Sequence, residues 1–235
     1  MMDFKRAERT LRILGEESFS RLVSARVLVC GVGGVGGYAA EHLARSGIGN
    51  LTLVDGDTVD ISNINRQIAA LSDTIGKYKC DVLKKRFFEI NPSADIKVYN
   101  KFIKSEQDIS VLLDDEYDFV IDAIDDVPAK IELILGCVNR SIPLISSMGA
   151  AGKLDISKIK TADISKTTDC PLARVVRRKL RERGVNKGVL TVFSTEEAIS
   201  SPGTEKPGSL SHIVSTFGAY CAQEAIKYIL LPDII

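Results

Sequence analysis

The chain has 235 residues, of which 45% are hydrophobic, and its 31 basic side chains balance its 31 acidic ones. This composition suffices for one α/β domain with a sizeable core, and the balanced charge gives no global reason to expect nucleic acid as a partner. Five dispersed cysteines argue against a zinc ribbon or disulfide framework, and no run approaches the ~20 apolar residues of a membrane span, which predicts a soluble, cytoplasmic protein without membrane contact.

The first two thirds of the chain alternate between predicted strands and helices. In chain order, the expected elements are a helical arm (1–25), a strand (26–30), a helix (35–46), a strand (51–54), a helix (77–90), a strand (95–100), a strand (117–125), a helix (128–140) and a strand (142–146). This order predicts a Rossmann-like, doubly wound, mostly parallel α/β sheet with helices on both faces. Its binding crevice is expected at the carboxyl ends of the strands.

The pattern changes after residue 150. Residues 153–164 and 189–196 alternate in polarity, which predicts two half-exposed antiparallel strands with a basic segment between them. A Pro/Gly/Ser-rich loop over 200–209 precedes a helix over 210–230, whose apolar face is expected to pack against the sheet. We therefore expect a single domain over 1–235, in which residues 26–150 form a nucleotide-binding core and residues 151–235 a substrate-facing extension.

The glycine-rich sequence GVGGVG follows the first predicted strand, and its glycines are Gly31, Gly33, Gly34 and Gly36. Glycines allow a tight turn and a close approach to a ligand, and the amino end of the following helix favours anions such as phosphate. Asp55 ends the second strand, where a carboxylate can accept hydrogen bonds from ribose hydroxyls. This motif alone fits NAD, FAD, S-adenosylmethionine or ATP.

The polar segment DGDTVDISNINRQ, residues 55–67, favours a triphosphate among these ligands. Arg66 can hold phosphate oxygens bidentately, and a nicotinamide site has no evident need for an arginine there. Asn63 and Gln67 can fix neighbouring oxygens or the loop itself. Lys79 follows at the start of a helix, where it can meet a polyphosphate as a point charge.

Carboxylates after the fourth predicted strand supply what a triphosphate also requires. Asp125 and Asp126 offer hard oxygen ligands for Mg²⁺, so the ribose anchor, the phosphate ligands and the cation site together predict MgATP. Structural roles are the alternatives for several residues: Asp57 as a turn cap, Asn63 as a loop former and Lys79 as a solvated helix residue.

Five motifs in residues 6–130 occur in the order typical of one enzyme superfamily: the arginines of "R…R..R.LG" (Arg6, Arg9, Arg12), GVGGVG, DGDTVDISNINRQ, GKYK and AIDD. With these motifs the chain resembles the E1-like adenylating superfamily, which includes ubiquitin-activating enzymes and the adenylyltransferases of molybdopterin and thiamine biosynthesis. The resemblance implies a homodimer that binds ATP and Mg²⁺, with an amino-terminal arginine acting in the partner's site.

The resemblance also implies roles for individual residues. Asp125, Arg66, Lys79 and either Arg9 or Arg12 are the expected catalytic residues, and Asp125 is the expected Mg²⁺ ligand. The expected nucleotide-binding residues are Gly31, Gly33, Gly34, Gly36, Asp55, Asp57, Ser62, Asn63, Arg66, Gln67, Lys79, Asp125 and Asp126.

The second half of the chain resembles one branch of this superfamily. DISKTTDCPLARVVRRKLRERGV followed by VFSTE is similar to the branch represented by tRNA threonylcarbamoyladenosine dehydratase. The resemblance implies ATP-dependent cyclisation of N6-threonylcarbamoyladenosine in tRNA through an acyl adenylate. Residues 174–187 carry a net charge of +6, an electrostatic footprint for an RNA backbone, although a solvated helix face is the alternative. The expected tRNA-binding residues are Arg174, Arg177, Arg178, Lys179 and Arg181.

Three other functions fit parts of the sequence. An adenylyltransferase for a ubiquitin-like sulfur carrier needs a cysteine acceptor, but the zinc-binding cysteine pairs common in that branch are missing, and Thr191 stands where some relatives carry a cysteine. An NAD-dependent oxidoreductase leaves Arg66, Lys79 and Asp125 unexplained. A non-enzymatic, nucleotide-gated partner of sulfur-transfer proteins also stays open.

Overall fold

The computed structural model describes residues 5–199 and 207–230. The loop expected over 200–209 therefore lies mostly outside the described residues. In the described part of the chain, none of the helices is long and apolar enough to cross a membrane.

Seven strands form one sheet within the described residues, in the order β3-β2-β1-β4-β5-β7-β6. Neighbouring strands are parallel except for β6 and β7, which pair antiparallel. The expected mostly parallel, doubly wound sheet with an antiparallel end is therefore confirmed. The strands are β1 (Arg26–Cys30), β2 (Asn50–Val54), β3 (Asp95–Tyr99), β4 (Phe119–Asp122), β5 (Leu144–Ser147), β6 (Ile159–Asp163) and β7 (Leu190–Ser194).

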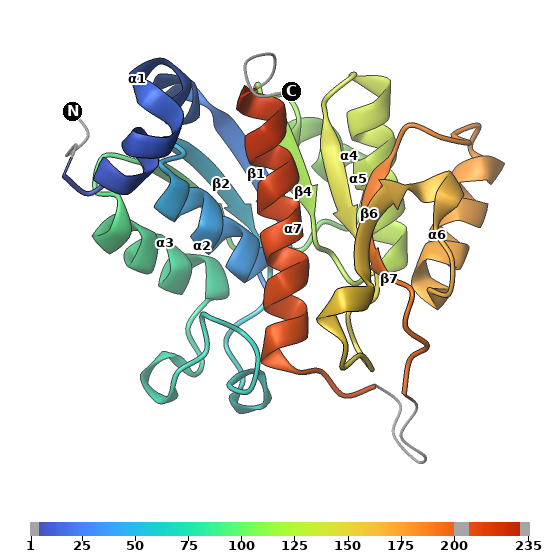
Figure 1. Ribbon diagram of the computed structural model, residues 1–235. Coiled ribbons are helices and arrows are strands. Elements are labelled where there is room, and N and C mark those ends of the chain that lie inside the picture. Colours follow the sequence, from blue (N-terminus) through green and yellow to red (C-terminus); the bar gives the residue numbers. More distant parts are fainter. Residues whose placement is uncertain (1–4, 200–206, 231–235) are drawn as a thin grey trace.

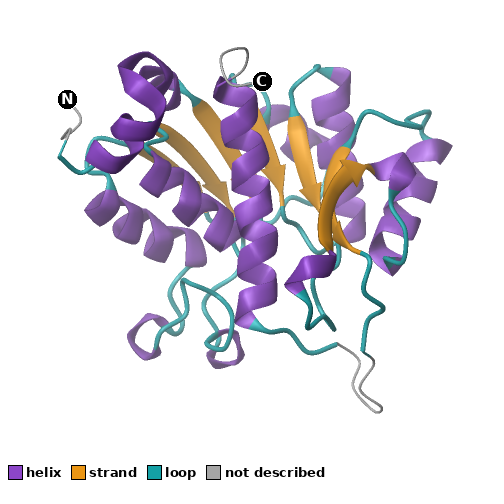
Figure 2. Ribbon diagram, viewed as in Figure 1, coloured by secondary structure: helices purple, strands orange, loops and turns teal. Residues whose placement is uncertain are grey.

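Helices cover both faces of the sheet, as Figures 1 and 2 show. One layer contains α1, α2, α3 and α7, and the opposite layer contains α4, α5 and α6. The helices are α1 (Glu8–Ser24), α2 (Gly36–Ser46), α3 (Lys79–Ile90), α4 (Glu106–Leu112), α5 (Val127–Asn139), α6 (Pro171–Glu182) and α7 (Ser211–Leu230).

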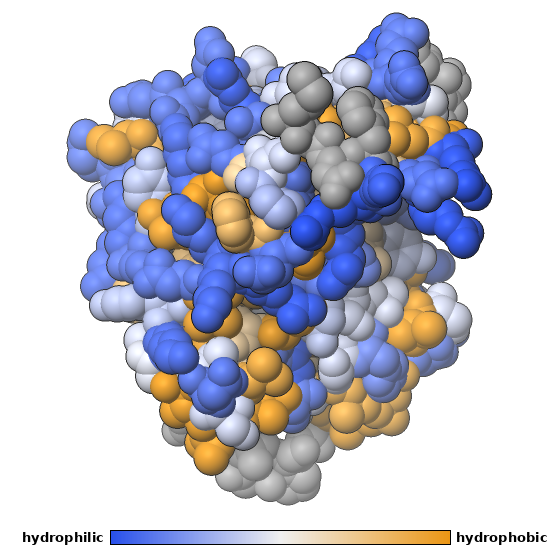
Figure 3. Space-filling view, turned by 90° about the vertical axis from the view of Figure 1, so that its left-hand side faces the viewer, coloured by the Kyte–Doolittle hydropathy of each residue, from blue (hydrophilic) through white to orange (hydrophobic). Residues whose placement is uncertain are grey.

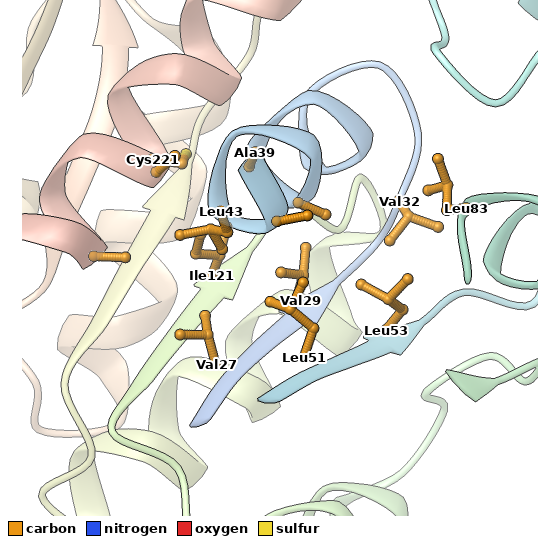
Figure 4. Packing of buried hydrophobic residues seen from close by; sticks show 14 of the residues in the cluster. Val27, Val29, Val32, Ala39, Leu43, Leu51, Leu53, Leu83, Ile121 and Cys221 are labelled. Carbon is orange, nitrogen blue, oxygen red and sulfur yellow. The ribbon is translucent and has the colours of Figure 1, made fainter. Parts of the chain in front are cut away.

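The central strands are apolar on both faces because each face is covered. In β1, Val27 and Val29 pack beneath α2 and α7, whereas Leu28 and Cys30 face the layer that contains α5. Figure 4 shows Val27 and Val29 beside residues of β2 and β4, with Leu43 of α2 close by. Burial of this apolar surface, worth roughly 25 cal/mol per Å², is the main force that holds the layers together.

Apart from element bounds, the structure differs most from the sequence prediction in two places. β7 is not half-exposed: four of its five residues are buried, because it pairs in parallel with β5 inside the sheet and leaves the edge to β6. Helix α4 was not expected at all. Its capping box joins Ser105, which accepts a hydrogen bond from the Asp108 backbone N–H, to the Asp108 carboxylate.

The direction of the strands brings three loops to one end of the sheet, the lower end in Figure 1. These loops are the glycine loop after β1, the segment 55–78 after β2 and the turn 123–126 after β4. The first turn of α7 lies there too, since a Cβ atom added at Gly34 would come within 3.3 Å of the Val214 side chain. Helix α1 lies at the opposite end.

Candidate functional site

The glycine loop is folded so tightly that side chains are excluded from two positions. Gly31 has a φ of 81°, and a Cβ atom there would lie 2.6 Å from the Ala123 carbonyl oxygen. A Cβ atom at Gly36 would lie 1.8 Å from the Gly31 carbonyl oxygen. The loop therefore turns directly into α2, and the first N–H groups of that helix face the carboxyl end of the sheet, where they can bind an anion.

Replacing Gly36 with alanine is expected to lower the free energy of unfolding by about 1–3 kcal/mol, because the added Cβ overpacks the loop. The displaced loop should also lose its affinity for ATP, which isothermal titration calorimetry would measure. Gly76→Ala is the control, because Gly76 has a positive φ of 82° but nothing lies within 4 Å of an added Cβ atom, so this variant strains the backbone without a clash. Normal ATP binding by Gly36→Ala would contradict the expected role of the loop.

The Asp55 carboxylate ties the glycine loop to the end of β2. Its Oδ2 accepts a hydrogen bond from the Val32 backbone N–H at 2.8 Å, and its Oδ1 accepts one from the Asp57 N–H at 2.8 Å. Burial raises the pKa of the Asp55 carboxyl group, although both N–H groups and the Lys79 ammonium act in the opposite direction. Each oxygen keeps a free lone pair, so the carboxylate can still accept a bond from a ribose hydroxyl.

Hydrogen bonds within residues 60–66 shape the segment that follows. Asp60 accepts from the Ser62 N–H at 2.8 Å, and the Asn63 side-chain oxygen accepts from the Asp60 N–H at 3.1 Å. Arg66 Nη1 donates to the Ser62 carbonyl at 2.8 Å and to the Asn65 side chain at 2.9 Å. Buried Asn63 thus acts as a loop former, the alternative that the sequence left open, while Arg66 is held by two acceptors at the site.

Gln67 lies against the glycine loop and has an unused hydrogen-bond acceptor. Its side-chain amide nitrogen is 3.7 Å from the position that a Cβ atom would take at Gly33. The residue is 8% exposed, and its Oε1 has no hydrogen-bond partner among the described residues. A buried acceptor of this kind is costly unless a donor reaches it, so a ligand that brings a donor to Gln67 Oε1 would bind favourably there.

Lys79 is a buried residue and not the solvated helix residue that was the alternative. It is 4% exposed, and its Nζ lies 2.7 Å from the half-exposed Asp57 carboxylate. The Asp57 backbone carbonyl also accepts a hydrogen bond from the Lys79 N–H. A polyphosphate could bind Lys79 only by competing with Asp57, a pairing that the sequence prediction missed.

The two carboxylates after β4 differ in what they do. Asp126 accepts a hydrogen bond from the Ala129 N–H at 2.9 Å and caps α5, a structural role that the sequence did not predict. Asp125 is exposed, and its carboxylate makes no hydrogen bond or ion pair within residues 5–199 and 207–230. It is therefore the carboxylate of the two that is free to bind a ligand.

The donor set at Asp125 fits Mg²⁺ only together with a nucleotide. In the described residues, no three His, Cys, Asp or Glu side chains are arranged to hold a metal ion. Mg²⁺ is commonly held by one or two carboxylates and by phosphate oxygens, so Asp125 could supply the protein oxygen and ATP the others.

The amino-terminal arginines lie far from this site in the same chain. Arg12 pairs with Glu8 at 2.5 Å on α1, and Arg9 is exposed on the same helix. Because α1 lies at the amino ends of the strands (Figure 1), neither arginine can reach the glycine loop of its own chain. A contribution from Arg9 or Arg12 thus requires a second subunit.

The basic segment contains α6, whose apolar face is buried through Ala173, Val176 and Leu180. Arg177 points inward and donates to the carbonyls of Ile164 and Thr167 and to the Thr167 hydroxyl. This contact gives Arg177 a structural role that the sequence did not predict, because its guanidinium holds the turn before α6 through Nη1. The other four expected tRNA-binding residues take no part in this contact; they are Arg174, Arg178, Lys179 and Arg181.

All five cysteines are buried. Burial raises the pKa of the Cys80, Cys137 and Cys221 thiols to about 12, so these groups are protonated at neutral pH. Cys170 is the N-cap residue of α6 and is 5% exposed. The nucleophilic form of cysteine is the thiolate. Cys80, Cys137 and Cys221 are therefore poor acceptors for an activated acyl group.

A family model, that of the ThiF family, matches residues 5–233. The chain belongs to the ThiF family. A ThiF-family relative from Bacillus subtilis (strain 168), a tRNA threonylcarbamoyladenosine dehydratase, is 48% identical over 79% of this chain and 73% of its own length. The enzyme of the same name from Escherichia coli (strain K12) is 37% identical over 93% of this chain and 91% of its own.

A solved structure of a relative has the same fold as this ThiF-family chain. The crystal structure of the E. coli tRNA N6-threonylcarbamoyladenosine dehydratase in complex with ATP covers 96% of this chain with a TM-score of 0.91 and 38% identity. The alignment covers 94% of that protein, so the likeness extends through the sheet and both helical layers.

Proposed function

We propose that this chain is an ATP-dependent tRNA threonylcarbamoyladenosine dehydratase. The observation that carries the proposal is the full-length likeness to an enzyme of that name, 38% identical, whose structure holds ATP. The glycine loop, Asp55 and Asp125 lie together at the carboxyl end of the sheet, where doubly wound folds bind nucleotides. The alternative, activation of a sulfur carrier, is less well supported, because it needs a cysteine acceptor and all five cysteines are buried.

The proposed reaction activates a carboxylate that is otherwise unreactive. An oxygen of the threonyl carboxylate attacks the α-phosphorus of ATP, and pyrophosphate leaves. The ureido group of the same modified adenosine then attacks the acyl carbon, loses its proton and expels AMP. The net change is a ring closed with loss of one water, and no enzyme nucleophile is required.

The side chains of the site have separate tasks in this proposal. Arg66 and Lys79 hold phosphate oxygens, so Lys79 exchanges the Asp57 carboxylate for phosphate when ATP binds. Asp55 accepts a hydrogen bond from the ribose. Bound Mg²⁺ would offset negative charge on the phosphates, and Asp125 would hold it.

We further propose a cytoplasmic homodimer in which Arg9 or Arg12 reaches the partner's site. Support comes from apolar side chains exposed on the segment 55–78, namely Ile61, Ile64, Leu71 and Ile75. Figure 3 shows hydrophobic surface near the lower end of one face of the molecule. An exposed apolar patch of this kind is typical of a protein interface.

The proposed function is tested by incubating the protein with ATP, Mg²⁺ and tRNA that carries N6-threonylcarbamoyladenosine. Mass spectrometry of the digested nucleosides should show loss of one water from the modified nucleoside, only when ATP is present. An unchanged nucleoside mass, with ATP consumed in response to a sulfur-carrier protein instead, would overturn the proposal.

A further inference from the structure

A buried ion pair lies directly beneath the turn that carries Asp125. Lys130 Nζ is 2.7 Å from Asp122 Oδ2, and the side chains of both residues are 0% exposed. Asp122 ends β4, and Lys130 lies in the first turn and a half of α5. The pair therefore joins the strand before the turn to the helix after it.

Every polar atom of this pair has a partner. The Lys130 ammonium also donates to the Ser146 hydroxyl at 3.3 Å and to the Ser147 carbonyl at 3.0 Å. The Ser146 hydroxyl donates to Asp122 Oδ2 at 2.5 Å. Three elements, β4, β5 and α5, thus meet at one fully satisfied cluster.

A buried ion pair is a poor way to gain stability alone, because removing two charges from water is costly and apolar side chains of similar size often serve as well. Such pairs are best explained where they fix one conformation. Here the conformation is that of the turn, because Asp122 Oδ1 accepts a hydrogen bond from the Ile124 N–H at 3.1 Å. Asp125 is the next residue.

The turn is held on its other sides as well. The Asp126 carboxylate is bonded to the Ala129 N–H, and the Ala123 N–H donates to the Cys30 carbonyl at 2.8 Å. The Ala123 carbonyl packs against Gly31 so closely that only glycine fits there. The Asp125 carboxylate is therefore the free group on a turn whose neighbouring residues are all fixed.

We infer that Asp122 and Lys130 are positioning residues that hold the 123–126 turn so that Asp125 presents its carboxylate to Mg²⁺ bound with ATP. This inference rests on the proposed function. The pair touches neither nucleotide nor metal. It acts through the hydrogen bond between Asp122 and the Ile124 N–H, in the way that outer groups orient metal ligands.

Two double variants separate positioning from stability. Asp122→Leu with Lys130→Met replaces the pair with apolar side chains and removes the acceptor for the Ile124 N–H. Asp122→Asn with Lys130→Met also removes both charges but keeps an acceptor at that place. The readout is the Mg²⁺ concentration that half-saturates binding of a non-hydrolysable ATP analogue, with analogue affinity in EDTA and urea unfolding measured beside it.

The Leu/Met variant is expected to need roughly 10–100 times more Mg²⁺, as is typical when an outer group of a metal site is lost. Its affinity for the analogue in EDTA should stay unchanged, and the Asn/Met variant should restore the normal Mg²⁺ requirement. A folded Leu/Met variant with the wild-type Mg²⁺ requirement would overturn the inference.

Two further outcomes are also decisive. If the Leu/Met variant does not fold, Ser146→Ala, which removes one hydrogen bond to Asp122, takes its place: a raised Mg²⁺ requirement supports the inference and an unchanged one overturns it. If the wild-type protein binds the analogue without any response to Mg²⁺, the proposed role of Asp125 fails and the inference fails with it. A wild type that responds to Mg²⁺, together with a Leu/Met variant that keeps the wild-type Mg²⁺ requirement, defeats the inference alone.

Discussion

Asp125→Ala is expected to slow ATP consumption by roughly 10²–10³-fold, the loss typical when one well-aimed electrostatic contact is removed from a transition state. The carboxylate is exposed at the carboxyl end of β4 and has no partner in the described residues, so its removal breaks no contact of the folded protein. The free energy of unfolding should therefore stay within about 0.5 kcal/mol of wild type. Pyrophosphate release and urea unfolding measure the two quantities.

The neighbouring carboxylate offers a matched control. Asp126→Ala removes the same chemical group one residue later, but its loss leaves the α5 N-terminus uncapped and should lower the free energy of unfolding by about 1 kcal/mol. It should keep far more activity than Asp125→Ala. If Asp126→Ala were the more damaging to ATP turnover, or Asp125→Ala were as active as wild type, the assignment of the metal ligand to Asp125 would be wrong.

The parts of the fold that the sequence predicts correctly are those governed by local pattern. The β1–α2–β2 unit follows from apolar runs on either side of GVGGVG, and Gly47 ends α2 in the left-handed conformation that favours glycine. The exposure of β7 could not be predicted in the same way. Alternating polarity indicates one buried face, but the strand enters the sheet beside β5, and only the tertiary order of strands determines that.

The candidate site shows the same division between local and long-range information. The roles of Gly31 and Gly36 depend on turns of a few residues, which a motif contains. The partners of Lys79 and Arg177 come from other elements, Asp57 after β2 and Thr167 before α6, and no spacing rule predicts that a basic side chain turns inward. Lys130 carried one usable signal: it lies at the start of an apolar helix, eight residues after Asp122, which is the acid inside the apolar run FVIDAI.

Charge reversal on α6 should weaken tRNA binding specifically. Arg174 and Arg181 are exposed, and their replacement by glutamate turns two phosphate-attracting groups into repelling ones. We expect binding of tRNA to weaken roughly tenfold or more at low salt, and the slope of log affinity against log salt to fall by about 1 for each lost phosphate contact. Filter binding at several salt concentrations measures both, while calorimetry should show unchanged ATP affinity.

The control for this variant must change the net charge equally without touching α6. Lys84→Glu with Lys85→Glu does so, because both lysines are exposed on α3 in the opposite helical layer. A general effect of net charge would weaken tRNA binding equally in both double variants, whereas a local binding surface predicts a loss in the α6 variant alone. Equal affinities for the α6 variant and wild type would show that the basic face of α6 is merely solvated, and tRNA would have to bind elsewhere.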